Sequence, residues 1–194
     1  MRSNKNVSVF GFTNALKVLN FLASNPEKDF IASEVQDKTK LSRPGVYLAL
    51  RELAAQGLVH RRSRGRLLIC GYNYEDPVAK QFKVLMVTLK LRELVNKLKE
   101  ISRKIILFGS ASRGEDTSES DLDLFVLAKD SGIVSKVITS YKLDRSVQPV
   151  IKTSADLPQW KEKNAVFYRE IENGIVLWED NRRDSQQVLS RGEL

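Results

Sequence analysis

The residues with the clearest chemical use lie in the stretch LFGSASRGEDTSESDLDLFV, residues 107–126. Gly109 and Ser110 follow an apolar run, and Asp121 and Asp123 stand one residue apart within the next one. Glycine lets a ligand approach the backbone, and the unpaired N–H groups at a helix start attract phosphate. Two carboxylates on one face of a strand offer oxygen ligands to a hard cation such as Mg²⁺.

These parts are what a nucleoside triphosphate (NTP) needs from a binding site. We expect a helix over 110–114, so the Ser110 hydroxyl can donate to phosphate and Arg113 can neutralise triphosphate charge. Mg²⁺ on Asp121 and Asp123 would take phosphate oxygens as further ligands. The alternative is a surface loop before an edge strand with two solvated aspartates. The predicted nucleotide site consists of Gly109, Ser110, Arg113, Asp121 and Asp123.

Short apolar runs that alternate with helical stretches surround this motif. Strands are predicted over 104–108, 122–126, 146–151 and 174–178, and helices near 131–140 and 155–172. Leu122 and Leu124 are expected in the core, with the two carboxylates facing away from it. The pattern predicts an α/β (α+β) domain of mixed sheet and helices.

The stretch FGSASRGEDTSESDLDLFV resembles the signature of the minimal nucleotidyltransferases, small members of the DNA polymerase beta-like superfamily. That signature is Gly-Ser, ten residues, then Asp-x-Asp, and the resemblance covers about residues 103–180. It implies metal-dependent transfer of a nucleoside monophosphate from an NTP to a hydroxyl, with release of pyrophosphate. Asp121 and Asp123 would then be the catalytic metal ligands, and another group must take the hydroxyl proton.

The proton acceptor is where this sequence departs from the family. Active members often carry a third carboxylate on the next strand, and that strand, SVQPVI, offers the neutral amide of Gln148. Asp144 lies just before the strand and Asp156 falls after it. Three alternatives stay open: Asp144 is the third carboxylate, catalysis proceeds with two carboxylates, or the domain binds nucleotide without turning it over.

The formal net charge of +8 is concentrated in the N-terminal half. Residues 1–102 hold 18 Lys and Arg against 9 Asp and Glu, whereas residues 103–194 hold 14 against 15. The N-terminal half is therefore typical of a polyanion binder.

The same half has the element order of a winged helix. Helices are predicted over 12–24, 31–39 and 42–56, followed by a hairpin around the arginines at 61–66. Ser42 is a good N-cap and Gly57 follows the third helix. The stretch LSRPGVYLALRELAAQGLVHRR resembles the passage from recognition helix to wing in winged-helix regulators, within about residues 10–75.

Basic and aromatic side chains fall on both elements that a winged helix presents to duplex DNA. The third helix would enter the major groove and the hairpin would contact phosphate or the minor groove. The alternative is that these side chains are only a solvated surface and the winged helix is a dimerisation module. The predicted DNA contacts are Arg43, Tyr47, Arg51, Arg61, Arg62, Arg64 and Arg66.

Residues 76–102 contain no Gly and have Pro only at position 77, so they predict one connecting helix about 40 Å long. Two apolar stripes follow it, one over Val78–Leu89 and one over Val84–Ile101. The second stripe predicts a homodimer, although packing on the C-terminal domain could also cover it.

The remaining composition limits the class of protein. Neither a membrane-length apolar run nor a signal-peptide apolar region is present, so we expect a soluble, cytoplasmic protein. Cys70 and His60 are the only residues of their types, which excludes an internal disulfide and a Cys/His zinc cluster. The expected organisation is a winged helix at 1–75, a connecting helix at 76–102, a nucleotidyltransferase domain at 103–180 and a flexible polar tail at 181–194.

Two functional hypotheses follow. The first is a nucleotidyltransferase that uses Mg²⁺ and an NTP, carried on a DNA-binding module. The second is a DNA-binding regulator whose nucleotidyltransferase-like domain only binds nucleotide or is inactive. The intact Gly-Ser and Asp-x-Asp pair favours the first hypothesis, and Gln148 favours the second.

Overall fold

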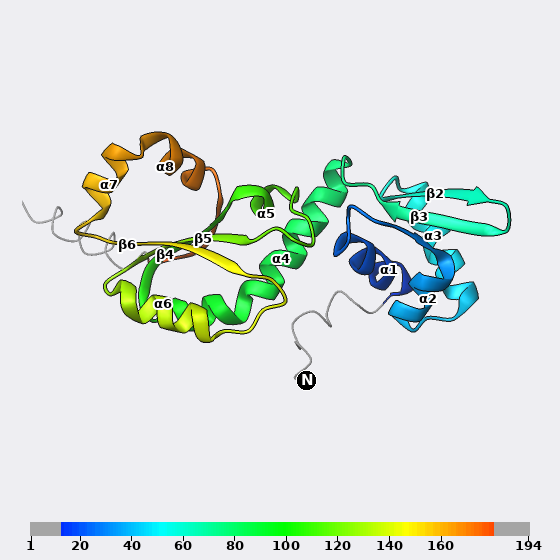
Figure 1. Ribbon diagram of the computed structural model, residues 1–194, viewed down its shortest axis with the longest axis horizontal. Coiled ribbons are helices and arrows are strands. Elements are labelled where there is room, and N and C mark those ends of the chain that lie inside the picture. The colour runs from blue at the N-terminus through cyan, green and yellow to red at the C-terminus, as the bar shows by residue number, and fades with distance from the viewer. Residues whose placement is uncertain (1–12, 181–194) are drawn as a thin grey trace, which may run out of the picture. The chain divides into compact units, whose positions relative to one another are not determined.

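The computed structural model describes residues 13–180, so Phe12 and the predicted polar tail at 181–194 lie outside the described residues (Figure 1). The chain divides into two compact units. The N-terminal unit consists of residues 1–91 and 110–120, and the C-terminal unit of residues 92–109 and 121–194. The segment between Gly109 and Asp121 therefore belongs to the N-terminal unit, although its two neighbours in sequence do not.

The N-terminal unit places three helices around a small antiparallel sheet with strand order β1-β3-β2. The predicted helices and hairpin are confirmed, whereas β1 was not predicted. Ser42 caps α3, because its Oγ accepts from the Gly45 N–H at 3.3 Å. Gly65, in the hairpin turn, has φ 60°. The elements are α1 (Asn14–Ala23), β1 (Asp29–Ile31), α2 (Ala32–Thr39), α3 (Arg43–Ala55), β2 (Val59–Arg64) and β3 (Leu67–Tyr72).

The core of this unit lies between α1, α3 and β3. Val18, Leu22, Val46 and Leu50 are completely buried. Tyr72 is buried beside them, and its hydroxyl donates to the Ala79 carbonyl at 2.5 Å. Burial raises the pKa of Tyr72, so the phenol keeps the proton that it donates.

The predicted connecting helix is confirmed as α4 (Pro77–Leu98). The Asp76 carboxylate starts it by accepting from the N–H groups of Val78 and Ala79, each at 2.9 Å. Leu91, Leu94 and Leu98 of the second apolar stripe are completely buried within one chain. These three leucines therefore need no second copy of the chain to cover them, and the homodimer stays a prediction. No described helix, α4 included, is long and apolar enough to cross a membrane.

The C-terminal unit is a four-stranded sheet with helices on both faces, in the order β6-β5-β4-β7. β5 and β6 are parallel and the other pairs are antiparallel. α6 covers one face, and α7 and α8 cover the other (Figure 1). The elements are β4 (Ser102–Phe108), β5 (Leu122–Ala128), α6 (Ser131–Ser140), β6 (Val147–Thr153), α7 (Leu157–Lys163), α8 (Ala165–Glu172) and β7 (Ile175–Glu179).

The predicted α/β class is confirmed, with one correction in this unit. The helical stretch predicted over 155–172 is two helices, which meet at Asn164. The Asn164 side chain donates from Nδ2 to the Trp160 carbonyl at 2.9 Å and so ends α7. The break lets α7 and α8 bring Trp160 and Tyr168 onto Phe125 of the sheet, with ring centroids 6.3 and 6.2 Å away.

The burial of Leu94 gives a test that separates fold from dimer. We expect Leu94→Glu to lower the free energy of unfolding by about 3–5 kcal/mol, because it leaves a buried charge without a partner. Leu85→Glu is the matched control, because Leu85 is on the same helix and 38% exposed; its effect should stay within about 0.5 kcal/mol. Urea unfolding measures both variants. If Leu94→Glu were as stable as the wild type and only dissociated a dimer in light scattering, the stripe would be a subunit interface.

Candidate functional site

The first half of the motif is positioned by the end of β4. In the antiparallel β4–β5 pair, Phe108 lies opposite Asp123. Gly109 follows with φ 69°, in the left-handed region that favours glycine, and begins the short helix α5 (Gly109–Arg113). A Cβ at this position would also collide with the Asp123 carboxylate. The Gly109 backbone and the Asp123 carboxylate therefore lie directly against each other.

The two aspartates stand at the start of β5. Leu122 and Leu124 are buried, as expected, and Asp123 projects from the other face together with Phe125. The expectation that the carboxylates face away from the core is wrong for Asp123, because α7 and α8 cover that face too. Asp123 is half-buried as a result, whereas Asp121, just before the strand, is exposed.

Burial raises the pKa of Asp123, and the neighbouring charges of Asp121 and Glu170 raise it further. Arg145 acts in the opposite direction. Glu170, on α8, is a residue of this site that sequence reasoning missed. The helical spacing of the apolar residues Phe167 and Ile171, four apart and close to Glu170, could have indicated that this end of α8 lies over the sheet. The site is thus a concentration of negative charge in a partly desolvated place.

Gln148 lies directly opposite Asp123 in the parallel β5–β6 register. Its Nε2 donates to Oδ2 of Asp121 at 3.3 Å, and the Ser146 hydroxyl donates to Oδ1. Arg145 donates from Nη2 to the Asp121 backbone carbonyl at 3.3 Å. The position expected to carry a third carboxylate therefore carries an amide that donates to the first one.

The two candidate substitutes for the third carboxylate lie at opposite ends of β6. Asp144 is exposed in the loop that leads to Ser146, and it lines a cavity of about 600 Å³ with Arg145. Asp156 lies beyond the far end of the strand, where its carboxylate accepts from the Thr153 hydroxyl at 2.6 Å. Only Asp144 is at the end of β6 that faces the start of β5. Among residues 13–180, no group of three or more His, Cys, Asp or Glu side chains could hold a metal ion.

Ser110 and Arg113 belong to the N-terminal unit. The Ser110 carbonyl accepts from the Glu115 N–H at 3.0 Å, and Arg113 donates from Nε to Glu115 Oε2 at 2.9 Å. Of the predicted nucleotide residues, the C-terminal unit thus brings together Gly109, Asp121 and Asp123.

The predicted DNA contacts of α3 are all exposed on the N-terminal unit. The Arg43 guanidinium lies over the Tyr47 ring, 5.7 Å from its centroid. Both residues line a cavity of about 310 Å³ together with Arg66 of the hairpin. The structure therefore brings helix and hairpin contacts into one surface, with Arg51 two turns along α3 from Arg43.

The four hairpin arginines are not equivalent. Arg62 donates from Nη2 to Asp29 at 2.8 Å, and the same carboxylate contacts His60 Nε2 at 2.7 Å. Gly71 lies opposite both Asp29 and His60 in the sheet, and a side chain there would collide with both. Arg62 is thus already held by the protein. All four arginines are exposed, Arg62 included.

The raised pKa of Asp123 predicts a pH-dependent gain in stability for Asp123→Asn. The folded protein holds this proton more tightly than the unfolded chain, so the stability from this group is present at low pH and lost as pH rises through the raised pKa. Asp123→Asn should therefore raise the melting temperature at about pH 7 and leave it unchanged at about pH 3. Asp130→Ala, which removes the α6 cap, should lower it at about pH 7. Calorimetry measures the melting temperature of each variant. A lower melting temperature of Asp123→Asn at neutral pH would show that the charged Asp123 does not destabilise the fold.

A comparison with models of known protein families identifies a match in the C-terminal part of the chain. Residues 89–183 match the family model "Polymerase beta, Nucleotidyltransferase". No curated protein matches the sequence. Among solved structures, a hypothetical protein of Pyrobaculum spherical virus is similar, with 18% identity and a TM-score of 0.29 over 48% of this chain and 57% of that protein.

A candidate nucleotidyltransferase from Sulfolobus solfataricus is similar at 12% identity and a TM-score of 0.32, over 54% of this chain and 86% of that one. At such TM-scores the two structures add nothing to what the family model gives. The matched range contains β4, β5 and β6, and with them Gly109, Asp121 and Asp123. Residues 89–183 therefore carry a nucleotidyltransferase-like domain.

Proposed function

We propose that this protein is a Mg²⁺-dependent nucleotidyltransferase that transfers a nucleoside monophosphate from an NTP to a hydroxyl acceptor, carried on a DNA-binding winged-helix module. The observation that carries the first part is the juxtaposition of Gly109 with Asp123 and, beside it, Asp121. Gly109 leaves room for the Asp123 carboxylate directly beside the start of α5. Two carboxylates next to a helix start suit a ligand that is both anionic and metal-bound.

The residues of the site fit a divalent cation. Carboxylate oxygens are the ligands that Mg²⁺ prefers. Burial raises the pKa of Asp123 and the neighbouring charges of Asp121 and Glu170 raise it further, so a cation bound here would offset that repulsion. The two carboxylates would hold Mg²⁺, which when bound offsets charge on the attacking and leaving oxygens. Phosphate oxygens would complete the shell of ligands.

The chain's own groups have separate tasks in this proposal. In this proposal the backbone N–H groups at the start of α5 and the Ser110 hydroxyl donate to a phosphate group, and Arg113 offsets its charge. The hydroxyl proton of the acceptor goes to Asp144 if a third carboxylate acts at all, because Gln148 has no basic oxygen to take it. Ser146 and Gln148 donate to the two carboxylate oxygens of Asp121 and so hold the orientation of this proposed ligand.

A second function is favoured by one observation, the Gln148 amide opposite Asp123. A site with two carboxylates and a neutral third position can bind a nucleotide without activating an acceptor. The protein would then be a DNA-binding regulator that senses a nucleotide.

The DNA-binding part of the proposal rests on surface and charge. α3 presents Arg43, Tyr47 and Arg51, and the β2–β3 hairpin adds Arg61, Arg62, Arg64 and Arg66. Arg66 lines the same cavity as Arg43 and Tyr47. Residues 1–102 carry twice as many basic as acidic residues, 18 against 9. A helix with a basic hairpin next to it is suited to the major groove and the flanking phosphates of duplex DNA.

Transfer of label distinguishes the two functions. Purified protein with Mg²⁺ and an NTP labelled at the α-phosphate should transfer label to an acceptor or to itself, and Asp121→Asn should abolish the transfer. Asp144→Asn should lower the rate about 100-fold if Asp144 takes the proton. Asp130→Asn is the control outside the site. Binding of the NTP without any transfer would contradict the enzyme and support the regulator.

Duplex DNA binding should depend mainly on charge. Replacing Arg64 and Arg66 together by Ala should weaken binding to all sequences alike and lower the salt slope by about 2, because each phosphate contact contributes about 0.9. Arg103→Ala, in the C-terminal unit, is the charge-matched control for one arginine. Mobility shifts at several salt concentrations measure the slope. Failure of the wild type to retain any duplex at low salt would refute the DNA-binding module.

A further inference from the structure

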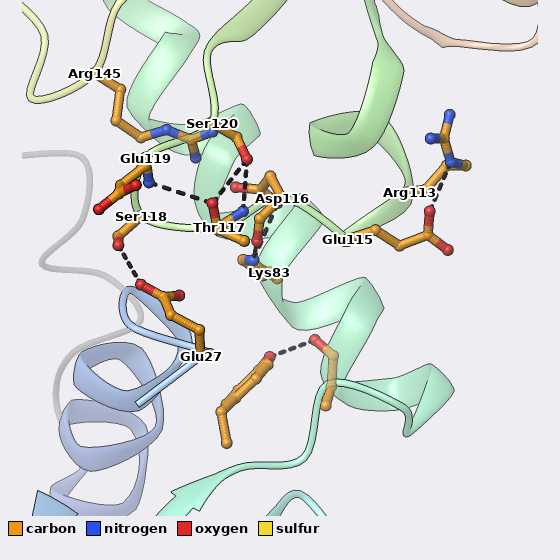
Figure 2. A network of polar contacts seen from close by, with 12 residues as sticks. Glu27, Lys83, Arg113, Glu115, Asp116, Thr117, Ser118, Glu119, Ser120 and Arg145 are labelled. Atoms are coloured by element: carbon orange, nitrogen blue, oxygen red, sulfur yellow. Dashed lines mark hydrogen bonds and ion pairs between the residues drawn. The ribbon is translucent and has the colours of Figure 1, made fainter. Parts of the chain in front are cut away.

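A cavity of about 540 Å³ in the N-terminal unit has a charged wall, lined among others by Lys80, Lys83, Glu115 and Asp116. Lys83 Nζ lies 3.2 Å from Asp116 Oδ1, and the exposed fractions of these two side chains are 6% and 0% (Figure 2). Lys80 pairs with Glu115, also at 3.2 Å. Because these four charges compensate one another within the unit, this cavity has little attraction for a charged ligand.

The cavity of about 600 Å³ in the C-terminal unit has a different wall. It lies within residues 138–149, between the end of α6 and the start of β6, and its size is typical of sites for small molecules. Lys142 and Arg145 give it two basic groups against one carboxylate, that of Asp144. Lys142 is exposed and makes no hydrogen bond or ion pair with residues 13–180. The wall thus carries a net positive charge and favours an anionic ligand.

Tyr141 gives this cavity a side that is held in place by the part of α4 that belongs to the C-terminal unit. Its hydroxyl donates to Glu93 Oε2 at 3.1 Å, and Lys97 Nζ lies over its ring, 5.0 Å from the centroid. Burial raises the pKa of Tyr141, and the bond to Glu93 raises it further, so the phenol keeps its proton. Ile138 and Val147 add apolar surface. The cavity therefore has one fixed side and combines apolar surface with basic groups.

The cavity adjoins Asp121 of the candidate site. Ser146, on the cavity wall, donates from its hydroxyl to Asp121 Oδ1, and Arg145 donates to the Asp121 carbonyl at 3.3 Å. β4, which ends just before Gly109, and β6, which starts at the cavity, flank β5 on opposite sides. The attacking and leaving oxygens of a phosphoryl transfer lie roughly in line. An NTP held on the β4 side therefore leaves the β6 side to the acceptor.

We propose that this cavity binds the acceptor, and that the acceptor carries a phosphate group, which Lys142 and Arg145 hold while its hydroxyl lies beside Asp121. This inference rests on the proposed function and names the acceptor class of that site. In the transfer, the acceptor oxygen forms a bond to the α-phosphorus, the bond from that phosphorus to the bridging oxygen breaks, and pyrophosphate leaves with the electron pair. The hydroxyl proton passes to Asp144, which lines the same cavity. A sugar phosphate and the end of a polynucleotide share this chemistry.

Binding of ribose 5-phosphate to the full chain tests the cavity, with ribose as the matched probe that lacks the phosphate. Ribose 5-phosphate should shift NMR amide signals within residues 138–149. It should also bind at least about tenfold more tightly than ribose, because a hydrogen bond to a charged group contributes at least about that much. Lys142→Glu should lower this affinity about tenfold or more, whereas Lys142→Arg should keep the charge and most of the affinity.

Lys136→Glu is the matched control, because Lys136 is exposed on α6 but lies outside the range 138–149 that forms the cavity. Its affinity should stay within about twofold of the wild type. In transfer assays with labelled NTP and Mg²⁺, Lys142→Glu should raise the KM for the acceptor about tenfold and leave the KM for the NTP unchanged.

A short single-stranded oligonucleotide with a free 3′ hydroxyl distinguishes the two sources of the acceptor. If it shifts the signals of 138–149 and binds more tightly than ribose 5-phosphate, the acceptor is a polynucleotide end. If ribose 5-phosphate binds there at least as tightly, the acceptor is a sugar phosphate.

The contrary outcomes are distinct. Equal affinity for ribose and ribose 5-phosphate, signal shifts only outside 138–149, or an unaltered affinity in Lys142→Glu overturns the inference. If ribose 5-phosphate binds within 138–149 but the wild type transfers no label from an NTP, the proposed transferase fails and the acceptor role fails with it, whereas the phosphate site itself stands.

Discussion

The β4–β5 register is the constraint on which the candidate site depends. Because Phe108 pairs with Asp123, β4 ends next to the Asp123 carboxylate. Gly109 follows with φ 69°, a left-handed conformation that lets the chain turn at this point. A slip of one residue would move Asp123 to the α6 face and Leu124 to the α8 face. Burial of Leu122 and Leu124 on one face of β5 therefore fixes Asp123 on the opposite face.

The two carboxylates of the site have different electrostatic surroundings. Asp121 receives donors from Ser146 and Gln148, whereas Asp123 is half-buried near Asp121 and Glu170, with Arg145 offsetting part of their charge. Such a site gains from any ligand that brings positive charge, and a metal-bound triphosphate brings it together with oxygens that backbone donors can hold. Because Gln148 is neutral, the site carries less negative charge than it would with a third carboxylate, and it keeps both Asp121 and Asp123.

Much of this could be predicted from the sequence because the signals are local. The apolar run before Gly109, the alternation through Asp121 and Asp123, the Ser42 cap and the long uninterrupted α4 each depend on neighbouring residues. Three features could not be predicted, since they depend on distant partners. β1 has only three residues and is defined by its pairing with β3. α7 ends at Asn164, inside an otherwise helical stretch. Lys83 and Asp116 are far apart in sequence and resemble ordinary surface charges until the fold buries them.

The central claim is that Gly109, Ser110, Asp121 and Asp123 serve one magnesium-nucleotide site, and calorimetric titration of an NTP with and without Mg²⁺ tests it most directly. Each half is incomplete alone, so Mg²⁺ should raise NTP affinity, and NTP should raise Mg²⁺ affinity by the same factor. Asp123→Asn should abolish this dependence and keep the fold. Equal NTP affinity with and without Mg²⁺, or an unaltered response in Asp123→Asn, would contradict the account.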